Sequence, residues 1–270
     1  MSFAVVNGAR LWYDVLPAMV AGAPTILFHH GYTASRVNWL PVAERLAGRY
    51  RVVLMECRGT GDSEHTADGY TLEQYAADVI GVADHLGLGA FTFAGHSMGG
   101  GVGYVLGLTH AARLERLILM APVPADGFPA PDAQARALRT ALRRERNRAA
   151  LLAQYRAGCV RPDVETNAWL DSRIDHIFAV SDGHFEGSAV AMQTLNVGAQ
   201  LATLTTATLV LAGAADGLLT ANIEDFRRLP NATLHVFSRA GHDIAIHEPD
   251  GVTAAIDAFM THGLPRPPGV

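Results

Sequence analysis

The sequence predicts an α/β fold with a mostly parallel central sheet of about eight strands, flanked by helices on both faces. Apolar runs rich in Val, Ile and Leu alternate with helical patterns along most of the 270 residues, as expected for parallel strands joined by crossover helices. A glycine-rich turn around Ser97 follows one apolar run directly and opens a helical pattern. Between residues 123 and 203 the alternation lapses into Pro-rich and helical sequence, which predicts an insertion.

Eight segments match the patterns of strands, and five match the 3.6-residue period of helices. Asn7 and Gly8, between the first two strands, are typical of a tight antiparallel hairpin. The predicted strands are residues 3–6, 10–16, 25–29, 51–56, 90–94, 115–121, 207–212 and 233–238. The predicted helices lie near residues 38–47, 71–86, 98–109, 220–228 and 250–262.

These elements divide the chain into a core, an insertion and a tail. We expect residues 1–122 and 204–264 to form the α/β core and residues 123–203 to form a helical cap. Residues 265–270 are expected to be loose, because they follow the last predicted helix and are rich in proline. A chain of this length can bury one large core together with a small accessory unit.

The pentapeptide Gly95-His96-Ser97-Met98-Gly99 joins a predicted strand to a predicted helix. So sharp a turn forces the serine into a strained backbone conformation, and the glycines on either side let it pack. The Ser97 hydroxyl would stand at a helix N-terminus, where free N–H groups and the helix dipole favour a developing negative charge. The pattern therefore predicts a nucleophile elbow.

Glycines recur every four residues in the helix after the elbow, at Gly99, Gly103 and Gly107. Each costs about 1 kcal/mol relative to alanine, so we expect a compensating close approach of this helix to the sheet. The cluster does not match G-x-G-x-x-G, because Leu106 occupies the place of the last glycine. A dinucleotide site is therefore not expected.

Composition excludes several classes of function. All 21 basic residues are arginine, so Schiff-base and P-loop chemistry is excluded by the absence of lysine. The net charge is −5 and no basic segment is interleaved with aromatic residues, so neither nucleic acid nor a membrane is an expected partner. Cys57 and Cys159 form no metal or disulfide pattern, and the N-terminal residues do not resemble a secretory signal. We expect a cytoplasmic location; these features do not predict an oligomeric state.

Four motifs occur in the order typical of one family. On these motifs the chain resembles the α/β-hydrolase family, over residues 1–122 and 204–262. The motifs that carry the resemblance are the pair of segments before the elbow, His30-Gly31-Tyr32 and Arg58-Gly59-Thr60-Gly61-Asp62-Ser63, and the pair after the insertion, Gly213-Ala214-Ala215-Asp216 and Gly241-His242-Asp243.

The resemblance implies a catalytic triad in the chain order Ser97, Asp216, His242. His242 would accept the proton of Ser97, and Asp216 would hold the imidazole in the required tautomer. The backbone N–H groups of Tyr32 and Met98 would bind the oxyanion. This chemistry implies no cofactor and no metal.

Two residues compete with members of this triad. Asp126 is the alternative acid, because some hydrolases of this fold carry the acid after the strand that here is predicted at 115–121. His247 lies five residues after His242 but lacks the preceding glycine, so we expect it to pack or to cap near Glu248.

Three further histidines lie near the predicted site. His29 and His30 are adjacent but match neither H-x-H-x-D-H nor H-E-x-x-H, so no metal site is expected there. His29 is instead typical of a histidine packed within a strand. His96, inside the elbow, is expected to support the nucleophile loop by hydrogen bonding.

Residues 135–153 of the predicted cap contain six arginines, and their spacing predicts one helix. The arginines, at positions 136, 139, 143, 144, 146 and 148, form either a solvated face or a cationic surface that attracts an anionic acyl substrate. The expected apolar stripe of this helix consists of Leu138, Leu142, Ala149 and Leu152.

The substrate pocket is expected to combine residues near the elbow with aromatic and soft apolar residues of the cap. Phe185 is a further candidate, for either the pocket or the core of the cap. The candidate substrate-binding residues are Tyr32, His96, Phe128, Trp169, Phe178, Met192 and Leu218.

The predicted function is cofactor-independent serine hydrolysis of a carboxylic ester, lactone or related acyl bond in a small-molecule substrate. A carbon–carbon bond hydrolase acting on a vinylogous diketone uses the same triad, although many such enzymes carry Trp where this chain has Asp243. An acyltransferase and a ligand-binding receptor on the same scaffold are further alternatives. Epoxide hydrolases and haloalkane dehalogenases need an aspartate nucleophile, so Ser97 argues against both.

Overall fold

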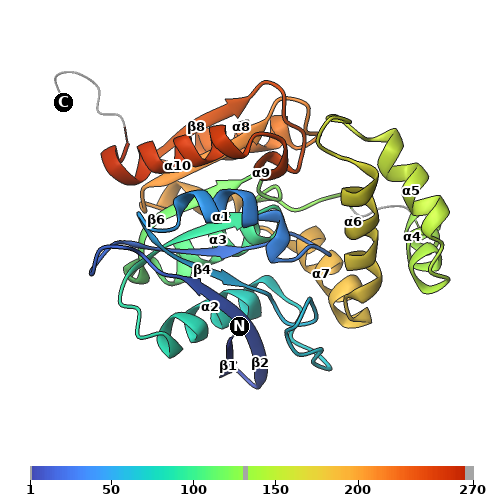
Figure 1. Ribbon diagram of the computed structural model, residues 1–270, viewed down its shortest axis with the longest axis horizontal. Helices are drawn as coiled ribbons and strands as arrows, with labels where there is room; N and C mark the ends of the chain where they lie inside the picture. Colours follow the sequence, from blue (N-terminus) through green and yellow to red (C-terminus); the bar gives the residue numbers. More distant parts are fainter. Residues whose placement is uncertain (1, 130–132, 265–270) are drawn as a thin grey trace.

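A computed structural model describes residues 2–129 and 133–264. Over these residues the chain forms an eight-stranded sheet in the order β1-β2-β4-β3-β5-β6-β7-β8, which confirms the predicted fold class (Figure 1). The strands are β1 (Ser2–Val6), β2 (Ala9–Leu16), β3 (Thr25–His29), β4 (Arg51–Met55), β5 (Phe91–His96), β6 (Leu114–Met120), β7 (Thr208–Gly213) and β8 (Ala232–Phe237).

Parallel pairing brings the loops of interest to one edge of the sheet. β1 and β2 form the predicted antiparallel hairpin, with Asn7 and Gly8 at φ 49° and 73°. β2 also pairs antiparallel with β4, and the pairs from β4 through β8 are parallel. Because β3, β5, β6, β7 and β8 run in the same direction, the loops after their carboxyl ends meet at the same edge.

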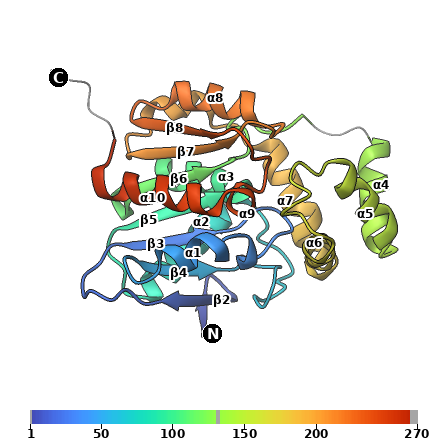
Figure 2. The same ribbon diagram turned by 45° about the horizontal axis from the view of Figure 1, so that its top comes forward.

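Helices cover both faces of the sheet, as Figure 2 shows from a second angle. Successive strand residues face opposite layers: Ile26 and Phe28 pack in one buried cluster, and Leu27 packs in the other. The first cluster lies beneath α1 (Leu40–Leu46) and α10 (Pro249–His262), next to the short α9 (Ile244–His247); the second lies beneath α2 (Leu72–His85) and α3 (Met98–Thr109), with α8 (Leu219–Arg228) on the same side.

The chain between β6 and β7 forms a helical insertion beside the carboxyl edge of the sheet (Figures 1 and 2). It has its own small buried cluster, which includes Leu142, Leu151, Ile174 and Phe178. The elements of the helical insertion are α4 (Ala133–Arg144), α5 (Arg148–Ala157), α6 (Asn167–Ala179), α7 (Asp182–Thr194) and η3 (Gly198–Thr203).

The prediction of one helix across residues 135–153 was wrong. The chain breaks between α4 and α5, where Arg146 takes φ 51° and the Asn147 side chain caps α5 by accepting from the Ala150 N–H. Of the predicted apolar stripe, Leu142 is buried and Leu152 is half-buried, whereas Leu138 and Ala149 are exposed.

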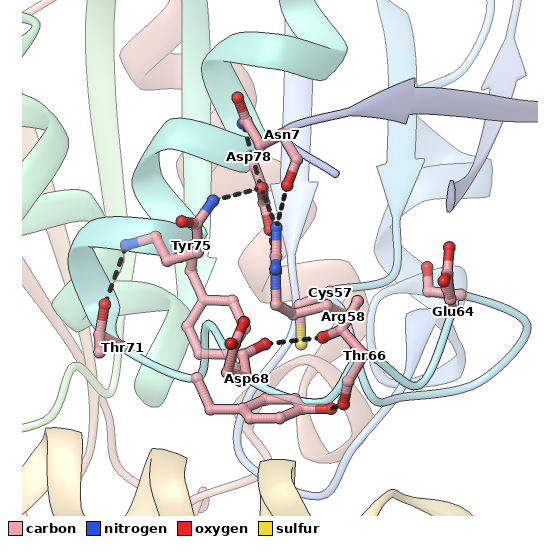
Figure 3. A network of polar contacts seen from close by, with 12 residues as sticks. Asn7, Cys57, Arg58, Glu64, Thr66, Asp68, Thr71, Tyr75 and Asp78 are labelled. Carbon is pink, nitrogen blue, oxygen red and sulfur yellow. Dashed lines mark hydrogen bonds and ion pairs between the residues drawn. The ribbon is translucent and has the colours of Figure 1, made fainter. Parts of the chain in front are cut away.

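A buried ion pair joins the hairpin, the loop after β4 and α2 (Figure 3). Arg58 donates from Nε and Nη2 to the two carboxylate oxygens of Asp78, at 2.7 Å each. Asn7 and Gln74 also donate to Asp78, at 3.1 and 2.9 Å. Four hydrogen-bond donors therefore offset the cost of burying this carboxylate. The same contacts tie the loop of Arg58 to the hairpin and to α2.

No helix among the described residues is both long and apolar enough to cross a membrane. The predicted loose tail, residues 265–270, lies outside the described residues.

Candidate active site

The turn from β5 into α3 has the predicted strained geometry. Ser97 takes φ 55° and ψ −111°, a conformation that L-residues rarely adopt. A Cβ on Gly95 would lie 2.1 Å from the carbonyl oxygen of Gly99, so no side chain fits there. The strain is held by backbone hydrogen bonds, because Ser97 N–H donates to Met120 O at 2.9 Å and Ser97 O accepts from Gly100 and Gly101.

The glycines of α3 allow the expected close approach to the sheet. A Cβ on Gly103 would lie 2.5 Å from the Leu119 side chain, and one on Gly107 would lie 2.9 Å from Leu117. At Gly99 a Cβ would lie 2.6 Å from the carbonyl oxygen of His29. The lost helix propensity is thus offset by packing, and the elbow is seated directly on β3.

Two loops from the far end of the sequence bring an acid and a base to Ser97. His242 Nε2 lies 2.9 Å from Ser97 Oγ, and His242 Nδ1 lies 2.9 Å from Asp216 Oδ2. An ionised carboxylate can only accept, so Nδ1 carries the proton and the bare Nε2 accepts from the serine hydroxyl. Asp216 Oδ1 accepts from the Leu218 N–H at 3.1 Å, which fixes the carboxylate.

Asp126, the alternative acid, takes a different partner. Its carboxylate is exposed and forms an ion pair with Arg228 of α8. The acid that contacts His242 in this structure is Asp216.

The Asp216–His242 contact changes the pKa of both groups. Burial disfavours protonated His242, but the hydrogen bond and charge of Asp216 outweigh burial and raise the pKa of His242 above 6.5. Burial likewise opposes ionisation of Asp216, and the hydrogen bond from His242 lowers the pKa of Asp216 below its ordinary value. The contact therefore stabilises an imidazolium beside an ionised carboxylate.

His96 positions the loop that carries His242. Its ring is buried, and Nε2 donates to the carbonyl oxygen of His242 at 3.0 Å. Burial, together with the charge of His242, lowers the pKa of His96 to about 4, so His96 is neutral near pH 7. The predicted supporting hydrogen bond is present, and it reaches the loop of the base.

The loop after β3 lies directly against the elbow. A Cβ on Gly31 would lie 3.1 Å from Ser97 Cβ, so this loop and the serine are in contact. Tyr32 follows in the same loop, and Met98 is the first residue of α3, where a backbone N–H has no acceptor within the helix. Both predicted oxyanion donors are therefore on segments that border Ser97 Oγ.

Two side chains of the helical insertion hold the loop that contains Tyr32 in place. Arg173 of α6 donates to the carbonyl oxygens of Thr33 and Tyr32, at 2.5 and 3.3 Å, and to Thr33 Oγ1 at 3.0 Å. His184 of α7 accepts from the Thr33 N–H at 3.3 Å, and burial lowers its pKa to about 3, so it is a neutral acceptor.

A cavity of about 740 Å³ lies between the elbow and the helical insertion, within the size range of small-molecule sites. Tyr32 and His96 line it together with Ser97 and His242, and so do three of the predicted residues of the insertion, Phe128, Trp169 and Met192.

Two of the predicted substrate-binding residues do not line this cavity. Phe178 belongs to the buried cluster of the helical insertion, where it packs with Leu142 and Leu151. Leu218 precedes α8 and donates its N–H to Asp216, so it supports the acid loop. Phe185 also belongs to the buried cluster of the insertion.

Motifs did not predict several polar residues of the cavity, because single polar side chains in helices and loops carry no local signal. Arg173 is the clearest case, since it follows an ordinary helical pattern. The polar cavity residues that no motif predicted are Asn38, Gln154, Tyr155, Glu165, Arg173 and Gln193.

The arginines of α4 and α5 divide between the two expected roles. Arg144 and Arg148 pair with acidic side chains of the helical insertion, as a solvated face would, while Arg143 is buried and donates to Ile177 O and Val180 O. Arg139 lines the cavity. The side chain of Arg136 lies outside the described part of the structure.

Two further histidines discussed above, His29 and His247, are buried. His29 is buried and donates from Nδ1 to His30 O at 2.9 Å, and burial lowers its pKa to about 4. His247 is buried, accepts from the Gly241 N–H at 3.0 Å and has Nε2 2.9 Å from Glu165. Among the described residues, no group of three or more His, Cys, Asp or Glu side chains could hold a metal ion.

Comparison with known proteins agrees with the order of these loops. The family model for the alpha/beta hydrolase fold matches residues 24–249, which include strands β3 to β8 and the helical insertion. The chain belongs to the α/β-hydrolase fold family.

Several relatives of this α/β-hydrolase fold protein are hydrolases by name. The protein named "Putative carbamate hydrolase RutD" from Caulobacter sp. (strain K31) is 29% identical over 276 residues, covering 97% of this chain and 98% of the relative. The 3-oxoadipate enol-lactonase 2 of Acinetobacter baylyi is 27% identical over 89% of this chain and 90% of its own. The crystal structure of the enol-lactonase from Burkholderia xenovorans LB400 superposes with a TM-score of 0.84 at 25% identity, covering 97% of this chain and 100% of that one.

Proposed function

We propose that this protein is a serine hydrolase that cleaves a carboxylic ester, lactone or related acyl bond of a small molecule through an acyl-enzyme on Ser97. The observation that carries the proposal is the continuous chain of two 2.9 Å contacts from Asp216 through His242 to Ser97 Oγ. This chain ends in a cavity that can hold a small substrate. The helical insertion would act as the cap over that substrate.

In the first half-reaction Ser97 Oγ bonds to the carbonyl carbon while His242 Nε2 takes the hydroxyl proton. The N–H groups of Tyr32 and Met98 stabilise the negative charge that develops on the carbonyl oxygen. As the tetrahedral intermediate collapses, the bond to the leaving oxygen breaks and His242 gives that oxygen its proton. The alcohol leaves, and the acyl group remains on Ser97.

In the second half-reaction His242 takes a proton from a water molecule, whose oxygen bonds to the acyl carbon. Collapse of this intermediate breaks the bond to Ser97 Oγ, which recovers a proton from His242. The products are the carboxylic acid and the free enzyme, so the cycle consumes only water and requires no cofactor. The enol-lactonase names among the relatives support a lactone or ester as the substrate.

A fluorophosphonate probe tests the nucleophile. We expect covalent addition to Ser97, located by mass spectrometry of the labelled peptide, and loss of labelling in Ser97→Ala. Ser172→Ala, a change at an exposed serine of α6, should label like the unmodified protein. Ester hydrolysis that persists in Ser97→Ala at the unmodified rate would overturn the mechanism.

A substrate panel then separates ester and lactone cleavage from the alternatives. We expect turnover of p-nitrophenyl esters or lactones, whereas a carbon–carbon bond hydrolase would act on ring-cleavage diketones. An acyltransferase would transfer the acyl group of an ester to an added alcohol faster than to water. A receptor would bind these compounds without turnover of any of them.

A further inference from the structure

Among the residues that the structure describes, four charged side chains besides the triad line the cavity. Two are carboxylates with hydrogen-bond donors, and two are guanidinium groups. The carboxylates Glu165 and Asp243 are both engaged. Glu165 accepts from the backbone N–H groups of Val160 and Arg161, at 3.1 and 3.0 Å. Asp243 accepts from the side chain of Asn38 at 2.9 Å.

The two guanidinium groups of the cavity have no carboxylate partner among the residues described. Arg173 donates only to neutral oxygens of the loop after β3. Arg139 lies over two aromatic faces, with its Cζ 5.4 Å from the ring centre of Tyr32 and 4.8 Å from that of Phe185. Among the described residues, therefore, no anion compensates the two positive charges that line the cavity.

Several other arginines of the insertion pair with carboxylates, whereas Arg146 stacks on Phe178 and Arg156 donates to Asn167. Arg143 pairs with Asp182, Arg144 with Glu186, and Arg161 with both Asp163 and Glu248. Arg139 differs from its helix neighbours Arg143 and Arg144 in lining the cavity.

Stacking gives Arg139 a geometry suited to an anion. A guanidinium that rests on an aromatic face keeps the N–H groups of its edge available, and that edge matches a carboxylate in a bidentate arrangement. The aromatic rings also hold the side chain in place, which lowers the entropy lost on binding. Tyr32, one of these rings, belongs to the loop that contacts the elbow, so a group bound at Arg139 shares the cavity with the bond attacked by Ser97.

We infer that Arg139 binds a carboxylate of the substrate, so that the preferred substrates are anionic esters or lactones derived from dicarboxylic or hydroxy acids. Arg173 adds positive charge to the same cavity while it holds the loop of Tyr32. This inference rests on the proposed function, because it assigns the substrate class of that site.

Matched substrate pairs test the inference through kcat/KM. One pair is p-nitrophenyl hemisuccinate and its methyl ester, which places the charge on the acyl side; the other is 4-carboxyphenyl butyrate and its methyl ester, which places it on the leaving group. We expect the anionic member of at least one pair to be preferred. In Arg139→Gln that preference should fall by about 10- to 100-fold, the effect of losing hydrogen bonds to a charged group, with little change for the neutral member.

Two further variants give the controls. Arg144→Gln, a change at an exposed arginine of the same helix, should keep the preference. Arg139→Lys keeps the positive charge but loses the two parallel N–H donors of the guanidinium, so an intermediate preference is expected. Equal losses for anionic and neutral substrates in Arg139→Gln, or no preference in the unmodified protein, would overturn the inference.

A binding measurement separates failure of this inference from failure of the proposed function. Calorimetry on Ser97→Ala should detect succinate and not succinamide, and the signal should weaken about 10-fold or more when Arg139→Gln is added. If the protein neither hydrolysed an ester nor labelled at Ser97, the proposed hydrolase function would be refuted. Succinate binding that depends on Arg139 would still support the carboxylate site. Equal binding of succinate with and without Arg139 would refute the carboxylate site alone.

Discussion

At the scale of single residues, the three side chains of the proposed triad depend on their neighbours for their protonation states. Asp216 is fixed by the Leu218 N–H, and the loop of His242 is held by the neutral ring of His96. Ser97 depends mainly on its backbone, because the strained backbone conformation exposes Oγ to His242.

The pH dependence of hydrolysis follows from the pKa of His242. Only neutral His242 can accept the serine proton, and Asp216 raises the pKa of His242 above 6.5. We therefore expect kcat/KM to fall as the pH drops, with the midpoint of the acid limb above pH 6.5. Rates for a neutral ester between pH 5 and pH 9 measure this midpoint, and a flat profile would contradict the role of His242.

Asp216→Asn removes the interaction that raises this pKa. His242 should then lose its proton more readily, so the acid limb should move to lower pH, while kcat falls by about 10⁴ because the wrong tautomer is favoured. Asp126→Asn serves as the control and should leave both kcat and the acid limb unchanged, because Asp126 pairs with Arg228. A loss of kcat in Asp126→Asn with little change in Asp216→Asn would instead assign the role of the acid to Asp126.

At the scale of elements, the elbow and α3 form one packed unit with β3. The hydroxyl of Ser97 reaches the cavity only because residues without side chains let the helix begin immediately after the strand. This requirement is local, which explains why the glycine spacing alone predicted the approach of α3 to the sheet. In α4 and α5 the pattern of apolar residues was misleading, since the chain breaks at Arg146 and the Asn147 side chain caps α5.

Gly95→Ala tests the packing of the elbow. Its Cβ would lie 2.1 Å from the Gly99 carbonyl oxygen, so the turn must shift, and we expect the free energy of unfolding to fall by about 3 kcal/mol or more. Gly89→Ala places its Cβ in open space and should change that free energy by less than about 0.5 kcal/mol. Urea denaturation followed by circular dichroism measures both, and equal stabilities would contradict this account of the elbow.

At the scale of the whole molecule, buried polar contacts connect segments that are far apart in the sequence. The helical insertion contributes Arg173 and His184 to the loop after β3, so the residues that border Ser97 come from both parts of the chain. In another buried contact, Arg58 and Asp78 join the β1–β2 hairpin to α2 through Asn7.

Arg58→Met tests this long-range pair. It would leave the Asp78 carboxylate buried without its cation, and we expect the free energy of unfolding to fall by about 3–5 kcal/mol. Arg144→Met, which breaks an exposed pair with Glu186, should cost less than about 1 kcal/mol. Thermal and urea unfolding compare the two variants, and a cost for Arg58→Met no larger than that control would contradict a stabilising role for the buried pair.

The strands, the elbow and the motif loops could be predicted from the sequence because each depends on neighbours within a few positions. The alternation of apolar residues locates the strands, and Gly95 and Gly99 mark the turn. The lining of the cavity could not be predicted in this way. Phe178 and Met192 are both apolar residues of the insertion, yet only Met192 reaches the cavity, because helix packing decides which face of each helix is covered.

From the sequence alone we could predict the fold class and name Ser97 and His242 as nucleophile and base, because the elbow and the motif loops are local patterns. The choice of Asp216 over Asp126 as the acid in contact with His242 came from the tertiary structure, and so did the position of Arg139 in the cavity while Arg144 pairs with Glu186. Charge compensation depends on distances between segments that are remote in the chain, and these distances are fixed when the sheet and the helical insertion pack together.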